Sequence, residues 1–317
     1  MNSQFENHMT KITKESKIYI AGHKGMVGSA CWRVLEAKGY TNLIGKTSNE
    51  LDLRNQQAVA EFIDSKKPDA IIDAAARVGG ILANDTYPYE FLMDNMLIQN
   101  NLIHSAHNND VNKFIFLGSS CIYPKMAPQP LKEEYLLTGP LEPTNQWYAI
   151  AKISGLKLIE ALRKQYDRDY VSLMPTNLYG PGDNYDLNSS HVLPAMLRKF
   201  YEAKEKDHSP VTLWGSGTPL REFLHVDDLA QAVVFSIENK LKEGLYNVGS
   251  GLEISIKDLA IMIQKIVGHT GEIIWDKTKP NGTPRKLMDT TRTTKLGWSP
   301  KINLQEGINM IYSNFVN

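Results

Sequence analysis

The chain has 317 residues, 42% of them hydrophobic and 22% charged, which is an ordinary composition for one large or two smaller globular domains. Lys plus Arg and Asp plus Glu both number 35, so no overall field would attract nucleic acid or an anionic membrane surface. Two cysteines are too few for a disulfide framework, and no run reaches the roughly 18 apolar residues of a membrane span, so we expect a protein of the reducing cytoplasm.

Short apolar runs alternate with longer helical stretches in the first half of the chain. The expected buried strands are residues 17–21, 42–44, 70–73, 113–117 and 170–174. The expected helices between them include residues 26–38, 89–109 and 148–166. Strands that alternate with helices pair in parallel through right-handed crossovers, so the pattern predicts an α/β fold with a doubly wound parallel sheet of the Rossmann type.

The regular alternation ends after Pro175. Residues 177–188 are rich in Gly, Pro, Asn and Asp and are expected to form an ordered loop region. Shorter elements are expected after them, with helices near 193–204 and 228–239 and strands near 211–214, 245–248 and 272–275. We therefore divide the chain into a polar extension at 1–16, a Rossmann domain at 17–180 with returning segments near 224–250, and a smaller C-terminal substrate lobe mainly at 181–317.

A glycine-rich turn joins the first strand to the first helix. Glycines at positions 22, 25 and 28 allow a tight turn and a close approach of the backbone to a pyrophosphate that lies on the helix N-terminus. The strand-turn-helix context makes this otherwise weak pattern a prediction of dinucleotide binding. The residues expected to contact the cofactor here are Gly22, His23, Lys24, Gly25, Met26, Val27 and Gly28.

The end of the second strand bears on which dinucleotide is bound. An NAD enzyme usually places Asp or Glu there to hold the ribose 2′-hydroxyl, but this chain has Gly-Lys-Thr-Ser at 45–48. Lys46 and Lys24 could pair with the 2′-phosphate of NADP(H), or both could be solvated surface lysines. We expect NADPH, and we expect no metal.

Tyr148 and Lys152 are spaced i,i+4, so both side chains share one face of a predicted helix. A nearby ammonium lowers the pKa of a tyrosine from about 10, which makes the phenol a usable proton donor to a ketone that receives hydride. Ser119 follows the fourth strand, where strand ends face the ligand crevice, and its hydroxyl could bind the same substrate oxygen. Together these motifs indicate an NADP(H)-dependent oxidoreductase.

This order of motifs resembles the extended short-chain dehydrogenase/reductase family, and within it the branch that makes GDP-L-fucose. The resemblance runs from about residue 16 to the end and is carried by residues 21–30, 78–88, 117–125, 142–152, 174–181, 214–228 and 282–286. Enzymes of that branch invert C3 and C5 of GDP-4-keto-6-deoxy-D-mannose and then reduce the C4 ketone with NADPH. The resemblance also implies a homodimer formed through the two long helices.

The resemblance assigns further residue roles. It implies that Cys121 is the base of the inversion, with a pKa lowered from about 8.5 by a lysine and the bound ligand, and that His191 is the partner acid. Without the resemblance, Cys121 fits a buried small hydrophobe and His191 a surface histidine. The implied substrate contacts are Lys199, Trp214, Arg221 and Lys286, although Trp214 could equally belong to a core. The implied cofactor contacts beyond the glycine turn are Leu117, Gly118, Ser119, Ser120, Tyr148, Lys152, Pro175, Thr176, Asn177, Leu178 and His191.

Two other interpretations stay open. The nearer one is another nucleotide-sugar 4-epimerase or 4,6-dehydratase of the same superfamily. A dehydratase commonly carries an acidic pair just after the strand-end hydroxyl, where this chain has Ser120 and Cys121. The more distant one is a regulator that binds NADP without chemistry, which the presence of Ser119, Tyr148 and Lys152 argues against.

Overall fold

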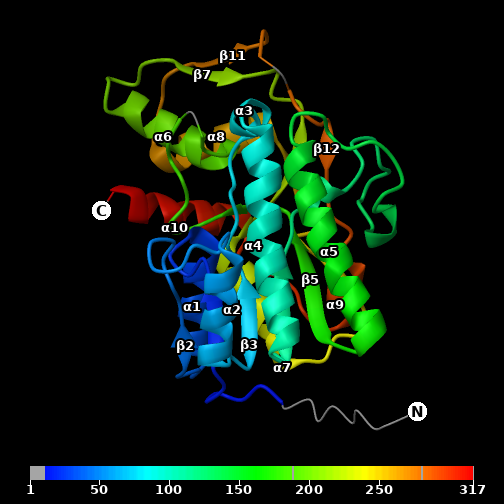
Figure 1. The fold of residues 1–317 in the computed structure, drawn as a ribbon. Coiled ribbons are helices and arrows are strands. Elements are labelled where there is room, and N and C mark those ends of the chain that lie inside the picture. The colour runs from blue at the N-terminus through cyan, green and yellow to red at the C-terminus, as the bar shows by residue number, and fades with distance from the viewer. Residues whose placement is uncertain (1–10, 188, 280, 317) are drawn as a thin grey trace, which may run out of the picture.

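A six-stranded parallel sheet forms the centre of the larger part of the molecule in the computed structural model, which describes residues 11–187, 189–279 and 281–316 (Figure 1). Its strand order is β2-β1-β3-β4-β5-β9, and every neighbouring pair is parallel. The strands are β1 Ile18–Ala21, β2 Leu43–Ile44, β3 Ala70–Asp73, β4 Lys113–Leu117, β5 Asp169–Pro175 and β9 Leu245–Val248. The apolar runs of the inner strands are buried, as a sheet covered on both faces requires.

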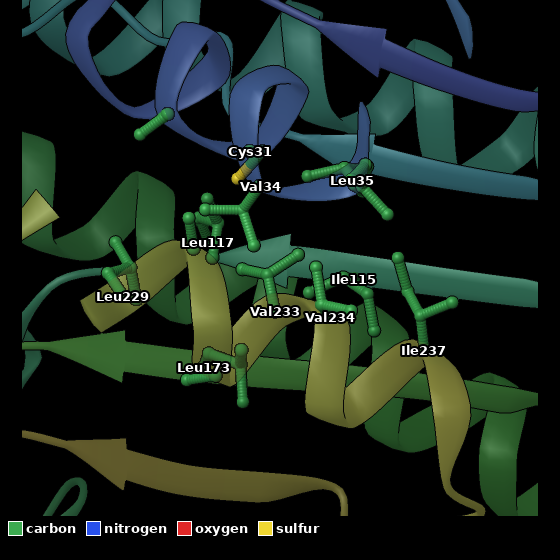
Figure 2. Packing of buried hydrophobic residues seen from close by; sticks show 14 of the residues in the cluster. Cys31, Val34, Leu35, Ile115, Leu117, Leu173, Leu229, Val233, Val234 and Ile237 are labelled. Carbon is green, nitrogen blue, oxygen red and sulfur yellow. The ribbon is translucent and has the colours of Figure 1, made fainter. Parts of the chain in front are cut away.

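Helices cover both faces of this sheet. One face carries α1 Met26–Ala37 and α7 Val226–Glu238, and Figure 2 shows their side chains packed on Ile115, Leu117 and Leu173 of the strands. The other face carries α2 Gln56–Lys66, α4 Pro88–Asn108 and α5 Gln146–Tyr166. The predicted doubly wound α/β fold is confirmed.

A smaller assembly of strands and helices lies beyond the carboxyl ends of the sheet strands. Its central strand, β8 Leu220–His225, pairs with three others, and a separate two-stranded sheet lies apart from them. The other strands are β6 Asn177–Tyr179, β7 Val211–Trp214, β10 Glu253–Ser255, β11 Ile273–Asp276 and β12 Arg285–Lys286. A third core joins these strands to α6 Val192–Lys204, α8 Ile256–Val267 and α10 Leu304–Val316. Four short elements remain, namely α3 Ile81–Thr86, η1 Ser120–Ile122, η2 Glu133–Tyr135 and α9 Thr291–Lys295.

Some expected elements differ from those observed. The region 177–188 was expected to be a loop, but it opens with β6, which is held by β8 more than 40 residues further along the chain. The helix expected from residue 228 begins at Val226, because the ring of His225 accepts a hydrogen bond from the backbone N–H of Asp227 and caps it. In the described part of the chain no helix is both long and apolar enough to cross a membrane.

Candidate active site

The glycine turn between β1 and α1 leaves no room for a Cβ atom at Gly22 or Gly28. A Cβ at Gly28 would come 2.1 Å from the carbonyl oxygen of Gly22, and Gly22 itself has φ +76°, a conformation that favours glycine. Gly25 precedes α1, and within the described residues no side chain caps this helix N-terminus. The first N–H groups of α1 are therefore available to a phosphate, so the turn fits the pyrophosphate of a dinucleotide.

The two lysines considered for a 2′-phosphate have different surroundings. Nζ of Lys46 is 3.0 Å from Oε1 of Glu50, whose other oxygen, Oε2, accepts hydrogen bonds from the backbone N–H and hydroxyl of Thr47. Lys24 is exposed in the glycine turn. Lys24 is therefore the lysine whose charge is more readily offered to a ligand, and its role in NADP(H) binding stays a prediction.

Tyr148 and Lys152 lie one turn apart on α5, as their spacing predicts. Nζ of Lys152 donates to the carbonyl oxygen of Leu117 at 2.9 Å and lies 5.8 Å from the centre of the Tyr148 ring. Burial raises the pKa of Tyr148, and the charges of Cys121 and Asp73 raise it further. The expected lowering by the ammonium is therefore wrong for this structure, in which desolvation dominates. A neutral phenol at neutral pH is nevertheless what a proton donor requires.

Cys121 lies in η1, the short turn that follows β4. Ser119 begins this turn, and its Oγ accepts a hydrogen bond of 3.4 Å from the backbone N–H of Cys121. The Cys121 side chain is buried, and burial raises the pKa of its thiol, although the charge of Lys286 acts in the opposite direction. The lysine therefore acts in the expected direction, but desolvation outweighs it, and the contribution of the bound ligand stays a prediction.

The charge of Lys286 acts on both the Cys121 thiol and His191, the predicted acid. Lys286 lies in β12 opposite Arg221 of β8, and it lines a small pocket together with Cys121, Ser120 and Glu142. Desolvation lowers the pKa of His191, the residue that precedes α6, and the charge of Lys286 lowers it further. Cys121 and His191 are therefore both within electrostatic reach of one ammonium.

The other predicted substrate residues lie on different elements. Nζ of Lys199 donates to the carbonyl oxygen of Thr212 in β7 at 3.0 Å, close to Trp214 at the end of the same strand. The Trp214 side chain is 55% exposed, with Nζ of Lys279 5.5 Å from its ring centre. The alternative of a core tryptophan is therefore wrong. The predicted contacts Pro175, Thr176, Asn177 and Leu178 occupy the end of β5 and the start of β6.

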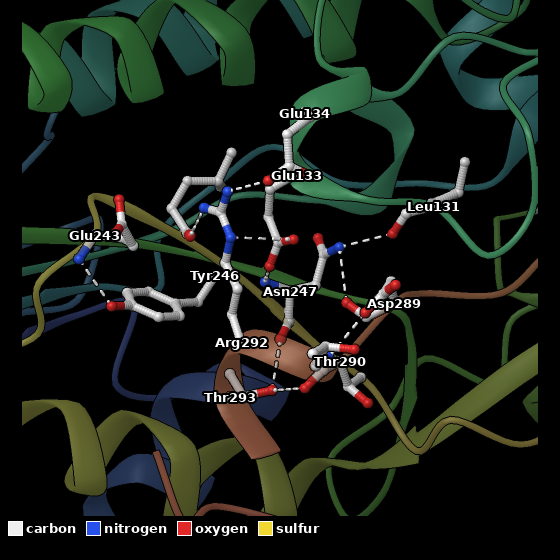
Figure 3. A network of polar contacts seen from close by, with 12 residues as sticks. Leu131, Glu133, Glu134, Glu243, Tyr246, Asn247, Asp289, Thr290, Arg292 and Thr293 are labelled. Atoms are coloured by element: carbon white, nitrogen blue, oxygen red, sulfur yellow. Dashed lines mark hydrogen bonds and ion pairs between the residues drawn. The ribbon is translucent and has the colours of Figure 1, made fainter. Parts of the chain in front are cut away.

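A buried polar network that the sequence did not reveal surrounds Asn247 of β9, and Figure 3 shows its contacts with Leu131, Glu133 and Asp289. The hydroxyl of Tyr123 donates to Oδ1 of Asn247 in β9 at 2.6 Å, and the backbone N–H of Asn247 donates to Oε1 of Glu133 at 2.9 Å. Nδ2 of Asn247 donates to the carbonyl oxygens of Leu131 and Asp289. Because these partners lie more than 40 residues from Asn247 in sequence, no local pattern could have identified them.

Glu222 of β8 also holds backbone segments together. It is fully buried, and its two carboxylate oxygens accept hydrogen bonds from the backbone N–H groups of Gly251 at 2.7 Å and Met288 at 2.9 Å. Met288 follows Lys286 by two residues. Glu222 therefore fixes the strand that presents the Lys286 ammonium to the pocket.

Comparison with known proteins identifies the group to which the chain is related. Residues 18–249 match the NAD dependent epimerase/dehydratase family. The chain belongs to this family. GDP-L-fucose synthase 1 of Arabidopsis thaliana is 54% identical over 94% of this chain and 93% of its own length, and GDP-L-fucose synthase of Escherichia coli K12 is 51% identical over 95% and 97%.

A solved structure in the family supports the same relationship. A GDP-mannoheptose C4 reductase from Campylobacter jejuni with NADP bound superposes with a TM-score of 0.89 at 39% identity, covering 96% of this chain and all of that one. The curated GDP-L-fucose synthases confirm the resemblance of the motifs, and the superposition confirms the fold.

Proposed function

We propose that the chain converts GDP-4-keto-6-deoxy-D-mannose into GDP-L-fucose, by inversion at C3 and C5 followed by NADPH-dependent reduction of the C4 ketone. The observation that carries this proposal is that Cys121 and Lys286 line one pocket, with Cys121 in the turn that Ser119 begins. Cys121 is within reach of the charges of both Lys152 and Lys286, and Lys286 also acts on His191. A reductase pair and a separate acid–base pair can therefore act on one bound sugar.

The inversion uses the acidity that the C4 ketone gives to the hydrogens on C3 and C5. In the proposed step, Sγ of Cys121 as thiolate takes the proton from carbon, and His191 returns a proton to the opposite face. Burial raises the pKa of Cys121, and the positive charge of Lys286 acts against that effect in favour of the thiolate. The same charge lowers the pKa of His191, so an imidazolium there gives up its proton more readily. Each inversion leaves the number of protons and electrons on the sugar unchanged, so this half of the reaction is an isomerisation.

The remaining catalytic residues act in the reduction of the C4 ketone. NADPH, when bound, supplies the hydride that C4 accepts. The hydroxyl of Tyr148 donates the proton to the ketone oxygen, while the hydroxyl of Ser119 binds the same oxygen and Lys152 supports the tyrosinate that forms. The cofactor would be held by the glycine turn of residues 22–28, by Lys24 at the 2′-phosphate, and by residues 117–120 and 175–178.

The GDP part of the substrate needs cations and a flat contact surface. Burial lowers the pKa of both Arg221 and Lys199. Arg221 donates to the carbonyl oxygen of Leu220, and Lys199 to that of Thr212. We assign these two residues and Lys286 to the pyrophosphate, since guanidinium and ammonium groups suit phosphate oxygens. Trp214 is assigned to the nucleoside. In this proposal the lobe at 181–317 binds substrate, while 17–180 with the segments near 224–250 binds the cofactor.

The assembly and location also remain proposals. Large apolar side chains are exposed on the outer sides of α4 and α5, which lie side by side (Figure 1), namely Tyr89, Met93, Trp147 and Ile150. We propose that a second copy covers them in a homodimer of the cytoplasm. Light scattering coupled to gel filtration should give twice the 35.7 kDa chain mass, and an Ile150→Glu variant should give the monomer.

The function is tested by supplying NADPH and GDP-4-keto-6-deoxy-D-mannose to the purified protein. Nicotinamide oxidation would be followed by absorbance, and the sugar product identified by NMR. Stoichiometric oxidation with formation of GDP-L-fucose is the expected result. No oxidation would contradict the proposal and favour a nucleotide-sugar 4-epimerase or 4,6-dehydratase.

A second candidate is a GDP-sugar C4 reductase that does not invert its substrate. The likeness to the Campylobacter jejuni C4 reductase favours it. In the same assay it would oxidise NADPH and leave a 6-deoxy sugar with unchanged C3 and C5. That product would remove the proposed roles of Cys121 and His191.

A further inference from the structure

A buried carboxylate without a role in the proposed mechanism lies close to Tyr148 and Lys152. Asp73 is the last residue of β3 and is fully buried. It lies in register between Ala21 of β1 and Phe116 of β4. Registered residues of parallel strands point to the same face, so Asp73 faces the side of the sheet that α4 and α5 cover.

The carboxylate has few hydrogen bonds for a buried group. Oδ1 of Asp73 accepts a bond of 3.3 Å from the backbone N–H of Ala75, and Oδ2 has no hydrogen-bond partner among the described residues. The hydroxyl of Tyr19, on the neighbouring strand, is buried and also lacks a partner in the described part of the chain. Burial raises the pKa of Asp73 to about 6, against the attraction of Lys152.

The charged and titratable groups around Asp73 come from several elements. Tyr19 belongs to β1, Tyr148 and Lys152 belong to α5, and Cys121 in η1 acts on both of the α5 residues. Burial lowers the pKa of Lys152, while the charges of Asp73 and Cys121 raise it. Nζ of Lys152 lies 4.8 Å from the ring centre of Phe116, the residue registered with Asp73. Asp73 is therefore positioned to influence both members of the reductive pair.

We propose that Asp73 is a positioning residue of the reductive site, whose carboxylate keeps the buried Lys152 ammonium charged and Tyr148 protonated. The negative charge favours the ammonium and disfavours the tyrosinate, so it restores the proton donor after each turnover. No covalent step is involved, and Asp73 need not touch the substrate. The catalytic part of this inference rests on the proposed reductase function, whereas the coupling between Asp73 and Lys152 does not.

The coupling is tested without turnover, by NMR of the full chain carrying aspartate labelled with ¹³C at the side-chain carboxyl. Comparison with Asp73→Asn assigns the signal, which should titrate near pH 6. In Lys152→Met the midpoint should rise by about half a pH unit or more, because the opposing positive charge is gone. Lys157→Met removes an exposed ammonium from the same helix and should leave the midpoint in place. An equal midpoint in the parent and Lys152→Met would overturn the coupling.

The positioning role is tested by the pH profile of NADPH oxidation. In Asp73→Asn the loss of rate at alkaline pH should begin at lower pH than in the parent, because Lys152 loses the charge that supports its protonated form. Tyr19→Phe removes the neighbouring hydroxyl and should keep the parent profile. A shifted NMR midpoint with an unchanged alkaline limb would overturn the positioning role. If the chain does not oxidise NADPH at all, the proposed function fails, while the NMR titration still decides the coupling.

Discussion

Two regions of buried carboxylate flank the candidate site, and their surroundings differ. Glu222 accepts hydrogen bonds on both oxygens, and Glu133 accepts one from Asn247 and pairs with Arg292. Asp73 accepts a single bond of 3.3 Å. A carboxylate held by backbone N–H groups fixes the chain segments that donate to it. A buried carboxylate with one weak bond stabilises little, but its charge reaches Lys152 and Tyr148. We therefore interpret the first region as structural support, and we propose that the second adjusts the charge of the Tyr148–Lys152 pair.

The largest effect is expected when Tyr148, whose protonation Asp73 is proposed to support, loses its hydroxyl. Tyr148→Phe should lower kcat for NADPH oxidation by about 100- to 10,000-fold, the usual contribution of a positioned acid. The free energy of unfolding should stay within about 1 kcal/mol of the parent, because only a hydroxyl is lost. Stopped-flow absorbance and urea unfolding measure the two quantities. A variant that keeps the parent rate would contradict the assignment.

Cys121→Ser separates the two halves of the reaction. A hydroxyl is a far poorer base than a thiolate, so exchange of solvent deuterium into C3 and C5 should slow by about 100-fold or more. Exchange is measured by NMR in D₂O without reduction of the ketone. Cys31→Ser is the matched control, since Cys31 is buried between α1 and the sheet and should leave the exchange rate unchanged.

Substitutions in the network around Asn247 should lower the free energy of unfolding. Asn247→Leu leaves the Tyr123 hydroxyl and two carbonyl oxygens without partners, so the free energy of unfolding should fall by about 3 kcal/mol. Asn309→Leu on exposed α10 is the control and should change it by less than about 0.5 kcal/mol. Urea unfolding measures both. An equal change in the free energy of unfolding at the two positions would show that the Asn247 network does not stabilise the fold.

Asp73→Asn should raise the free energy of unfolding, in contrast to Asn247→Leu, and the size of this gain should depend on pH. Folding raises the pKa of this carboxyl from 3.8 to about 6, so its contribution to stability is fully present below about pH 4 and is lost as pH rises through 6. The variant should therefore gain stability over the parent between pH 4 and 8, by at most about 3 kcal/mol at about 1.4 per pKa unit. Urea unfolding at both pH values tests this. A constant difference would contradict the raised pKa.

The sequence predicts the sheet and its cofactor turn because both depend on local patterns. Apolar runs mark β1, β3 and β4, and the spacing of three glycines marks a turn in which Gly22 and Gly28 leave no room for a Cβ atom. The signs of two pKa shifts could not be obtained in this way. Whether the pKa values of Tyr148 and Cys121 are raised or lowered depends on how deeply the fold buries the two side chains, which is a tertiary property.

Asp73 illustrates the same limit in a different form. In the sequence it ends an apolar run and resembles a polar residue at the solvent end of a strand. Only the packing of α5 on β4, the strand that pairs with β3, brings the charge of Lys152 within reach of Asp73. Likewise, the exposure of Trp214 could not be predicted, because core and ligand-facing tryptophans have similar local sequences.

The central claim is that one pocket inverts and reduces the same sugar with different residues. The most direct measurement incubates Tyr148→Phe with NADPH and GDP-4-keto-6-deoxy-D-mannose in D₂O, and follows the sugar by NMR and the nicotinamide by absorbance. We predict that deuterium enters at C3 and C5 while NADPH is not consumed. A folded variant that takes up no deuterium, although the parent protein produces GDP-L-fucose, would contradict the claim.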